Sequence, residues 1–287
     1  MPYSVSISFS QFYDRINLPG NHRQTAINRR DRLIGMLKKD FHILEAFATG
    51  SIPRYTALKG YADLDIIVVL HYGKHTKGRL PSSVLQEVRD SLSGYITNVR
   101  KNGQAVTMYY KSWPSVDIVP ATRIIDSIGN FVGYEIPNMT TEEWIYSKPK
   151  KHSKNMSTMV SICGSNFKQV ITMIKWWNKK HGNYLQSYHI EVIALKAYLG
   201  LLSDMPWDVF LYFEKACELI SNPLWYEESF VDSYLTYTNR LEVEKRLQTA
   251  RDIARNAWHE TYNANNNHEK GISKWRQIFG QEFPAYG

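Results

Sequence analysis

The stretch ATGSIPRYTALKGYADLDIIVVL, residues 48–70, decides the fold because it joins a tight turn, a pair of carboxylates and a buried strand. Gly50-Ser51 predicts the turn, and the branched aliphatic run at 66–70 predicts a strand buried in the core. Side chains alternate along a strand, so Asp63 and Asp65 should point to the same face. Two like charges at the mouth of an apolar strand destabilise the fold unless a cation lies between them, because each raises the other's pKa. The stretch therefore predicts a metal site.

A third carboxylate, Asp117, lies in the short apolar run Val116-Asp117-Ile118-Val119-Pro120. If this run pairs beside the first strand, Asp117 can reach the same point as Asp63 and Asp65. Three oxygen ligands suit a hard divalent ion such as magnesium, with manganese as a substitute, and such ions take substrate phosphates as their remaining partners. The pattern is typical of phosphoryl transfer assisted by two metal ions.

The order of these motifs resembles that of the DNA polymerase β-type nucleotidyltransferases. The matching residues are Gly50-Ser51, Arg54, Thr56-Ala57, Asp63-x-Asp65 and Asp117-Ile118-Val119-Pro120. A Gly-Ser pair or an Asp-x-Asp motif alone is common by chance, whereas the ordered set at this spacing is specific. Within that superfamily the chain most resembles the bacterial cGAS/DncV-like nucleotidyltransferases, which make cyclic oligonucleotide signals in anti-phage defence. The resemblance extends from about residue 22 to the C-terminus and departs from the family at Tyr55, where these enzymes often have a small residue.

Composition limits the class of protein. The 287 residues fit one large domain or two modest ones, and the formal net charge of +8 favours partners that carry phosphate. No aliphatic run approaches the ~18 residues of a membrane span, and residues 1–9 do not read as a secretory signal, so we expect a cytoplasmic protein without membrane contact. Cys163 and Cys217 predict buried free thiols. They lack histidine partners at zinc-site spacing, and animal cGAS senses DNA with a zinc-binding thumb, so we expect no activation by DNA.

Periodicity predicts an α+β fold at residues 1–150 and a helical domain at 151–287. The resemblance implies that the first is the nucleotidyltransferase palm and that the second closes the nucleotide cleft. The first half should contain a basic spine helix at 22–44, strands at 43–49, 104–110, 115–120 and 131–136, a helical turn at 53–58, and a helix from Pro81 to Gly103. The polar segment 148–155 is the expected boundary. The second half should contain an amphipathic helix at 241–258, a loop at 263–267 and aromatic anchors at Trp275, Phe279 and Phe283.

The second half also supplies candidate nucleotide-binding residues. Lys175 lies at the margin of an apolar helix face, where it either extends its ammonium to water or binds the donor triphosphate, as the family's matching lysine does. Ser187 is placed to cap the next helix, which alone would explain it. The resemblance implies that Gly50 and Ser51 bind the triphosphate, that Ser187 contacts phosphate and that Tyr188 stacks on a base. We expect His189 to be a hydrogen-bonded structural residue, and Glu191 to pair with it or with a nearby base.

Together these features predict a template-independent enzyme in which Asp63, Asp65 and Asp117 are catalytic and bind magnesium. It would join nucleoside triphosphates, ATP among them, into a cyclic di- or trinucleotide that a downstream effector recognises, under possible control by regulators from the same operon. One alternative is the same chemistry with a linear oligoadenylate as product, or with a nucleotide added to an RNA end or another acceptor. A second is a catalytically retired module that binds nucleic acid. Gly287 is either an ordinary chain end or a carboxylate joined to another molecule by a ubiquitin-like machinery.

Overall fold

The computed structural model describes residues 3–262 and 266–287. The chain divides into two compact units, a sheet unit of residues 18–154 and a helical unit of residues 1–17 with 155–287. The division differs from the expected one in that residues 1–17 belong to the helical unit. The reason is aromatic packing, because Phe9 lies 4.8 Å from Trp275 and Phe12 lies 4.7 Å from Phe279, measured between ring centroids.

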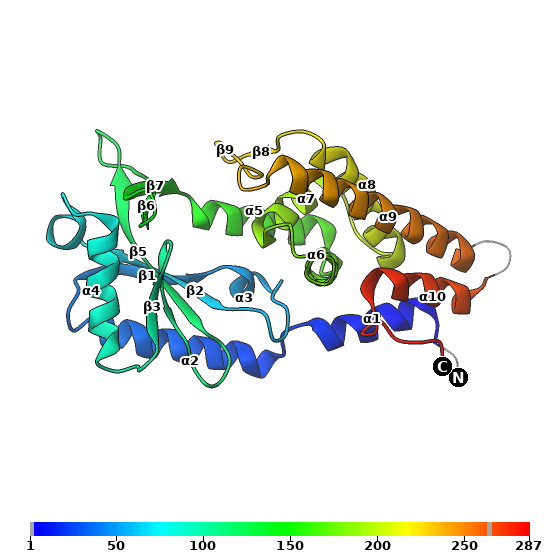
Figure 1. The fold of residues 1–287 in the computed structure, drawn as a ribbon, viewed down its shortest axis with the longest axis horizontal. Helices are drawn as coiled ribbons and strands as arrows, with labels where there is room; N and C mark the ends of the chain where they lie inside the picture. Colours follow the sequence, from blue (N-terminus) through cyan, green and yellow to red (C-terminus); the bar gives the residue numbers. More distant parts are fainter. Residues whose placement is uncertain (1–2, 263–265) are drawn as a thin grey trace. The chain divides into compact units, whose positions relative to one another are not determined.

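The sheet unit is a mixed sheet with helices against one face, which confirms the predicted α+β fold (Figure 1). Its elements are α2 (Gly20–Leu37), β1 (Ile43–Thr49), α3 (Ser51–Arg54), β2 (Leu64–Leu70), the π-helix η1 (Tyr72–Thr76), α4 (Pro81–Ser93), β3 (Val99–Asn102), β4 (Ala105–Met108), β5 (Val116–Ile125), β6 (Phe131–Asn138) and β7 (Glu143–Ser147). The strand order is β1-β2-β5-β4-β3, and β6 joins β5 to β7. Strands β2 and β5 are parallel neighbours, so their N-terminal ends meet at one edge of the sheet.

The two faces of the sheet differ. One face packs against α2 and α4 through a large apolar cluster that includes Leu33, Leu64, Ile66 and Val88. The other face carries a small cluster around Ile67, Val69, Ala121 and Tyr134. Because side chains alternate along β2, Asp65 lies on the face of Ile67, opposite the helices. The sequence pattern thus places the carboxylates away from the main core.

Several sequence predictions in this unit are confirmed and others are wrong. The strand at 43–49 is present with the predicted bounds, and the strands near 104–110 and 115–120 pair as expected. The helix that begins at Pro81 ends at Ser93 and not at Gly103, because Val99 pairs with Met108 as the start of β3. The expected turn at 53–58 occurs earlier, as α3. The division between the units falls between residues 154 and 155, within the expected boundary segment 148–155, but this segment is the start of a helix, α5, with Pro149 at its first position.

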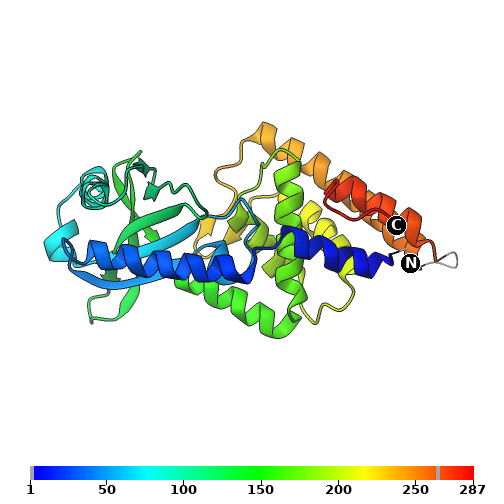
Figure 2. The ribbon, with the colours of Figure 1, turned by 90° about the horizontal axis from the view of Figure 1, so that it is seen from below.

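The helical unit contains the rest of the chain. Its elements are α1 (Val5–Ile16), α5 (Pro149–Cys163, which begins in the sheet unit), α6 (Asn166–Lys180), α7 (Ser187–Ala197), α8 (Met205–Ile220), β8 (Trp225–Tyr226), β9 (Ser229–Phe230), α9 (Tyr237–Tyr262) and α10 (His268–Phe279). Figure 2 shows α1 beside α6 and α10, and these helices are in contact. The predicted helix at 241–258 is confirmed within α9, and Trp275, Phe279 and Phe283 are fully buried anchors.

Two further findings concern this unit. Sequence periodicity did not predict α1 or the small β8–β9 hairpin. Residues 263–265 of the predicted loop at 263–267 lie outside the described residues. Within the described ranges, the helices lack a stretch long and apolar enough to cross a membrane.

Candidate functional site

The site begins at the turn between β1 and α3. Gly50 precedes α3 with φ +78° and ψ −162°, a conformation that is essentially confined to glycine. A Cβ atom added to Gly50 would lie only 1.8 Å from Oδ2 of Asp65. The turn therefore requires glycine at position 50 for two reasons. One is the backbone conformation, and the other is that the Asp65 carboxylate lies against this residue. Ser51 opens α3 directly beside this contact, and Arg54 ends that helix.

Four polar side chains lie in one row across the sheet. Thr49 on β1 is the register partner of Asp65 on β2, Asp65 is the partner of Asp117 on β5, and Asp117 is the partner of Thr107 on β4. Register partners on neighbouring strands have side chains on the same face. We call Thr49, Asp65, Asp117 and Thr107 the carboxylate row. The structure thus places Asp117 directly beside Asp65.

Thr107 holds one end of the row. Its Oγ1 donates a hydrogen bond of 2.5 Å to Oδ1 of Asp117. Thr107 is buried, so the bond fixes the orientation of the Asp117 carboxylate on the sheet. Sequence analysis missed this residue. The available signal was a threonine alternating with apolar residues in Ala105-Val106-Thr107-Met108, but only the strand register shows which carboxylate it meets.

The electrostatics of the row are unfavourable without a cation. The pKa of Asp65 is raised to about 7, first by burial and then by the neighbouring Asp117 charge. Arg54 opposes this rise, and Asp63 adds to it, which places Asp63 within electrostatic reach of Asp65. Burial also raises the pKa of Asp117, against the opposing effect of the Thr107 hydrogen bond. Burial of both carboxylates, with repulsion added at Asp65, disfavours their charged forms, and a bound cation would offset both effects.

These carboxylates fit a divalent ion that is shared with a substrate. As the described side chains stand, they include no ready-made cluster of three or more His, Cys, Asp or Glu residues around one ion position. Magnesium needs few protein ligands, because it keeps waters and takes phosphate oxygens from its substrate. Asp65 and Asp117, with the adjacent Asp63, supply the hard oxygen donors that such an ion prefers.

Lys175 lies in the helical unit as one half of a buried ion pair. Its Nζ donates a hydrogen bond of 2.7 Å to Oε1 of Glu191, and the side chains are only 4% and 0% exposed. Of the options for Glu191, pairing with a nearby base is confirmed. The ammonium of Lys175 therefore does not extend to water. Its other predicted role, binding the donor triphosphate, stays a prediction. A buried pair of this kind is costly to break, because removing one partner leaves the other charge uncompensated.

Ser187 and Tyr188 begin α7. The prediction that Ser187 caps the helix is wrong, because the cap position is Gln186 and Ser187 is the first helical residue. The cause is Asn178 on α6, whose side-chain amide binds both the N–H and the C=O of Leu185 and so holds the chain extended up to the helix. The Tyr188 ring meets the edge of Tyr226, at 6.1 Å between centroids.

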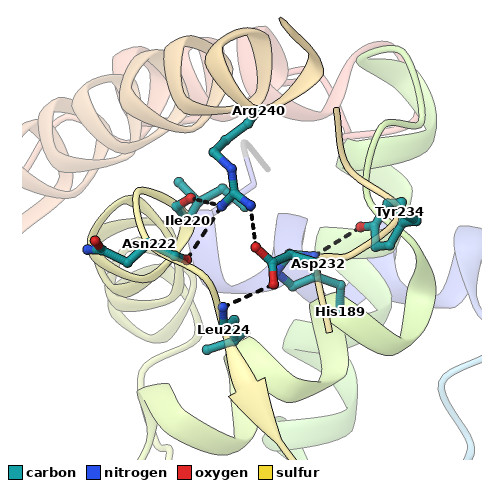
Figure 3. Close-up of polar contacts among 7 residues, drawn as sticks. All are labelled: His189, Ile220, Asn222, Leu224, Asp232, Tyr234 and Arg240. Atoms are coloured by element: carbon teal, nitrogen blue, oxygen red, sulfur yellow. Dashed lines mark hydrogen bonds and ion pairs between the residues drawn. The ribbon is translucent and has the colours of Figure 1, made fainter. Parts of the chain in front are cut away.

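A polar network fixes the start of α7 (Figure 3). The Tyr234 hydroxyl accepts the backbone N–H of Gln186 at 2.9 Å and lies 3.0 Å from Nδ1 of His189. His189 is buried, which lowers its pKa to about 4, so the predicted structural role for this histidine is confirmed. Beside it, Arg240 pairs with Asp232 and donates to the carbonyl of Ile220, while Asp232 accepts the Leu224 N–H. The network ties the loop after α8 to the first turn of α7.

The structure thus brings some of the expected site residues together. Gly50, Ser51, Asp63, Asp65 and Asp117 gather at one end of the sheet unit. Lys175, Ser187 and Tyr188 belong to the helical unit. There Lys175 forms an ion pair with Glu191, whereas Ser187 and Tyr188 lie at the start of α7.

Comparisons with known proteins identify what this arrangement is similar to. Residues 3–159 match the profile of the family described as "Second Messenger Oligonucleotide or Dinucleotide Synthetase domain". Among curated proteins, a cyclic AMP-AMP-AMP synthase of Acinetobacter sp. is 26% identical over 281 residues, with 84% of this chain and 73% of that protein covered.

Solved structures share the fold over nearly the whole chain. The structure of CdnC from Escherichia coli MS115-1 with ATP matches with a TM-score of 0.76 at 19% identity, over 97% of this chain and 98% of that one. The cyclic AMP-GMP synthase DncV of Vibrio cholerae, in complex with the linear intermediate 5′ pppA(3′,5′)pG, matches with a TM-score of 0.70 at 12% identity, over 99% and 97%. At these identities the likeness concerns the fold.

Proposed function

The chain belongs to the family of second messenger oligonucleotide or dinucleotide synthetases and is a nucleotidyltransferase, and from this premise we propose that it condenses nucleoside triphosphates into a cyclic di- or trinucleotide. In each step a 3′ or 2′ hydroxyl loses its proton and attacks the α-phosphorus of another nucleotide, and pyrophosphate leaves. ATP is the first substrate to test, because the Acinetobacter relative is named as a cyclic AMP-AMP-AMP synthase.

The observation that carries the proposal is the carboxylate row beside the Gly50-Ser51 turn. Asp65 and Asp117 are register partners, and the Asp65 carboxylate lies against Gly50. Burial first, and then the charges of Asp117 and Asp63, raise the pKa of Asp65 to about 7. A cluster of negative charges that destabilises the folded protein is typical of a place where a cation and an anionic substrate bind together.

Each residue of the sheet unit has a distinct role in the proposal. Asp63 and Asp65 would hold two magnesium ions, and Asp117 would share one of them; manganese could substitute. When bound, these ions lower the pKa of the attacking hydroxyl and neutralise the leaving pyrophosphate. Thr107 orients Asp117 through its hydrogen bond, and Ser51 with the Gly50 turn binds the triphosphate tail.

The helical unit would contribute the remaining nucleotide contacts. Lys175 would bind the donor triphosphate while Glu191 holds its ammonium in place, since an ammonium has three donors. Ser187 would contact phosphate and Tyr188 would stack on a base, with the Tyr234 network fixing the helix turn that carries both. The closing role of residues 151–287 in the nucleotide cleft is part of the same proposal.

We also propose that the product is a cytoplasmic signal in anti-phage defence, recognised by a downstream effector, with regulators encoded in the same operon. The support for this part is the family description, which names second messengers as products.

The test is a labelled-nucleotide assay with the full chain. ATP labelled at the α-phosphate is incubated with magnesium and the protein, and the products are then treated with phosphatase. We expect pyrophosphate release and a labelled product that resists phosphatase, because a cyclic molecule has no terminal phosphate. The double variant Asp63→Asn/Asp65→Asn should lose both, whereas Asp14→Asn, at an exposed position of α1, should keep both.

Other outcomes distinguish the alternatives. A product that loses its 5′ phosphates to phosphatase, and so changes in charge while keeping the label of its internal phosphodiesters, would indicate a linear oligoadenylate. A label retained only on added RNA would indicate end addition. Salt-dependent binding to long nucleic acid with no turnover of any nucleoside triphosphate would indicate a binding module. Turnover that survives in the double variant would contradict the assignment of the carboxylates.

A further inference from the structure

Of the three carboxylates in the proposed site, Asp63 alone lies outside the sheet. Strand β2 begins one residue later, at Leu64, whereas Asp65 and Asp117 are register partners inside β2 and β5. Strand pairing therefore sets the directions of Asp65 and Asp117 but not that of Asp63. The Asp63 side chain is also exposed, so core packing does not orient it. Contacts of the chain on either side of Asp63 have to set its position.

The chain just before Asp63 is held by Trp113. The indole Nε1–H donates a hydrogen bond of 2.7 Å to the carbonyl oxygen of Ala62, which lies 51 residues earlier in the sequence. The peptide group between Ala62 and Asp63 is planar, so a fixed carbonyl also fixes the N–H of Asp63 and the direction towards its Cα. An indole has a single donor, and this contact uses it. The bond thus determines where the Asp63 side chain starts.

Trp113 is itself held from α2. Its ring stacks on the ring of His22, with 5.0 Å between the centroids. The Arg29 guanidinium donates to the carbonyl oxygens of Ser112, at 3.1 Å, and of Pro114. These two residues directly precede and follow the tryptophan, so the backbone on both sides of the indole is anchored. The ring therefore has little freedom to turn its N–H away from Ala62.

The loop that carries Trp113 also leads into the strand of Asp117. Strand β5 begins at Val116, directly after this loop, and Asp117 is its second residue. The N–H of Leu64 donates to the carbonyl oxygen of Ser115 at 3.0 Å, which joins the loop to the start of β2. One hydrogen bond before Asp63 and one after it therefore tie this residue to the loop that precedes Asp117. All of these contacts lie within the sheet unit.

We propose that Trp113 is a positioning residue for the metal site, and that its indole N–H holds Asp63 where the carboxylate can share a divalent ion with the other two. Trp113 does not touch the ion or the substrate in this role. The inference rests on the proposed function, in which Asp63 binds magnesium. An indole suits the role because it combines a flat ring that stacks on His22 with one fixed donor for the Ala62 carbonyl.

The test removes the donor and keeps an aromatic ring. Trp113→Phe deletes the N–H, and Trp113→benzothienylalanine deletes it with little change of shape, because sulfur replaces the N–H in the same bicyclic ring. The matched control is Trp144 on β7, whose indole N–H donates to the carbonyl oxygen of Arg79 at 3.0 Å within the same unit. Arg79 comes after the C-terminal end of β2, whereas the carboxylates lie at its N-terminal end. The same two substitutions at Trp144 therefore remove an equivalent hydrogen bond away from the site.

The readout is the rise in Tm that manganese causes in the full chain at a fixed concentration of a non-hydrolysable ATP analogue, which needs no turnover. We expect half of the maximal rise at about 10- to 100-fold higher manganese in both Trp113 variants, the usual loss when a group that orients a metal ligand is removed. Both Trp144 variants should titrate as the wild type does. The magnesium dependence of pyrophosphate release should shift in the same way, and saturating magnesium should restore kcat.

The outcomes separate this inference from the proposed function. Unchanged manganese titrations in the Trp113 variants, or equal shifts in the Trp144 variants, would overturn the positioning role. If Trp113→Phe does not fold, the benzothienylalanine variant decides between these results. A wild-type protein that manganese stabilises but that releases no pyrophosphate would contradict the proposed function, while a shift in the Trp113 variants would still support the positioning of Asp63. A wild-type protein on which manganese has no effect would contradict the metal site and this inference with it.

Discussion

Gly50→Ala is the substitution whose effect the structure defines most sharply. The new Cβ would lie 1.8 Å from Oδ2 of Asp65, whereas an ordinary contact is about 3.4 Å or more, so the carboxylate would have to move by about 1.6 Å. A displacement of ~1 Å at a reacting centre can lower the rate by ~100-fold. We therefore expect kcat for pyrophosphate release to fall by at least ~100-fold.

A matched control is available in the same loop region. Gly60 also has a positive φ, +79°, but no atom lies within 4 Å of a Cβ placed there. Gly60→Ala should therefore lower the free energy of unfolding by a similar amount, ~1–2 kcal/mol, through its backbone conformation and without moving Asp65. Gly50→Ala should cost ~1–3 kcal/mol, because its backbone conformation is essentially restricted to glycine.

The assay compares initial rates of pyrophosphate release from ATP with the midpoints of urea unfolding for both variants. We expect comparable stability losses and activity lost only in Gly50→Ala. The reasoning is refuted if Gly50→Ala keeps a rate within threefold of Gly60→Ala, or if both variants lose activity in proportion to their stability.

Three further predictions concern charge and hydrogen bonding. Because the folded pKa of Asp65 is raised to about 7, its charged form destabilises the metal-free protein as pH rises from ~4 to ~7. Asp65→Asn should therefore raise the free energy of unfolding by up to ~4 kcal/mol more at pH 8 than at pH 4. Equal effects of the substitution at both pH values, measured by urea unfolding with EDTA, would contradict this. Lys175→Met should cost ~3–5 kcal/mol by leaving Glu191 unpaired, and adding Glu191→Gln should restore stability but not nucleotide binding, as calorimetry can measure; a double variant that binds ATP as the wild type does would exclude the phosphate role. Tyr234→Phe removes the hydroxyl that faces His189 and the start of α7 and should raise KM for ATP several-fold with a smaller change in kcat; an unchanged KM would show that this network is not needed to position the nucleotide.

The sheet unit was largely predictable because its signals are local. The aliphatic run after Asp65 and the alternation around Asp117 fix two strands and the face of their carboxylates, and β2 and β5 indeed pair with these residues in register. The Thr107 hydrogen bond could not be predicted in this way. It depends on the register between β4 and β5, which only the folded sheet determines.

The errors share a physical cause, which is that distant contacts override local propensity. Gly103 was expected to end a helix, but pairing of Val99 with Met108 makes that segment a strand. Ser187 was expected to be a helix cap, but Asn178, nine residues earlier, sets where the helix begins. The partner of Glu191 was not an error but was left open between His189 and a nearby base, because only the packing of α6 against α7 shows that it is Lys175.

The central claim is that Asp63, Asp65 and Asp117 hold divalent ions against a triphosphate bound at the Gly50-Ser51 turn. The most direct measurement is a crystal structure of the full chain with manganese and a non-hydrolysable ATP analogue, with the ions located by anomalous scattering. The account predicts anomalous peaks at about 2.1 Å from carboxylate oxygens of these residues, with the triphosphate beside Ser51. Ions bound elsewhere, or a triphosphate bound away from this turn, would contradict it.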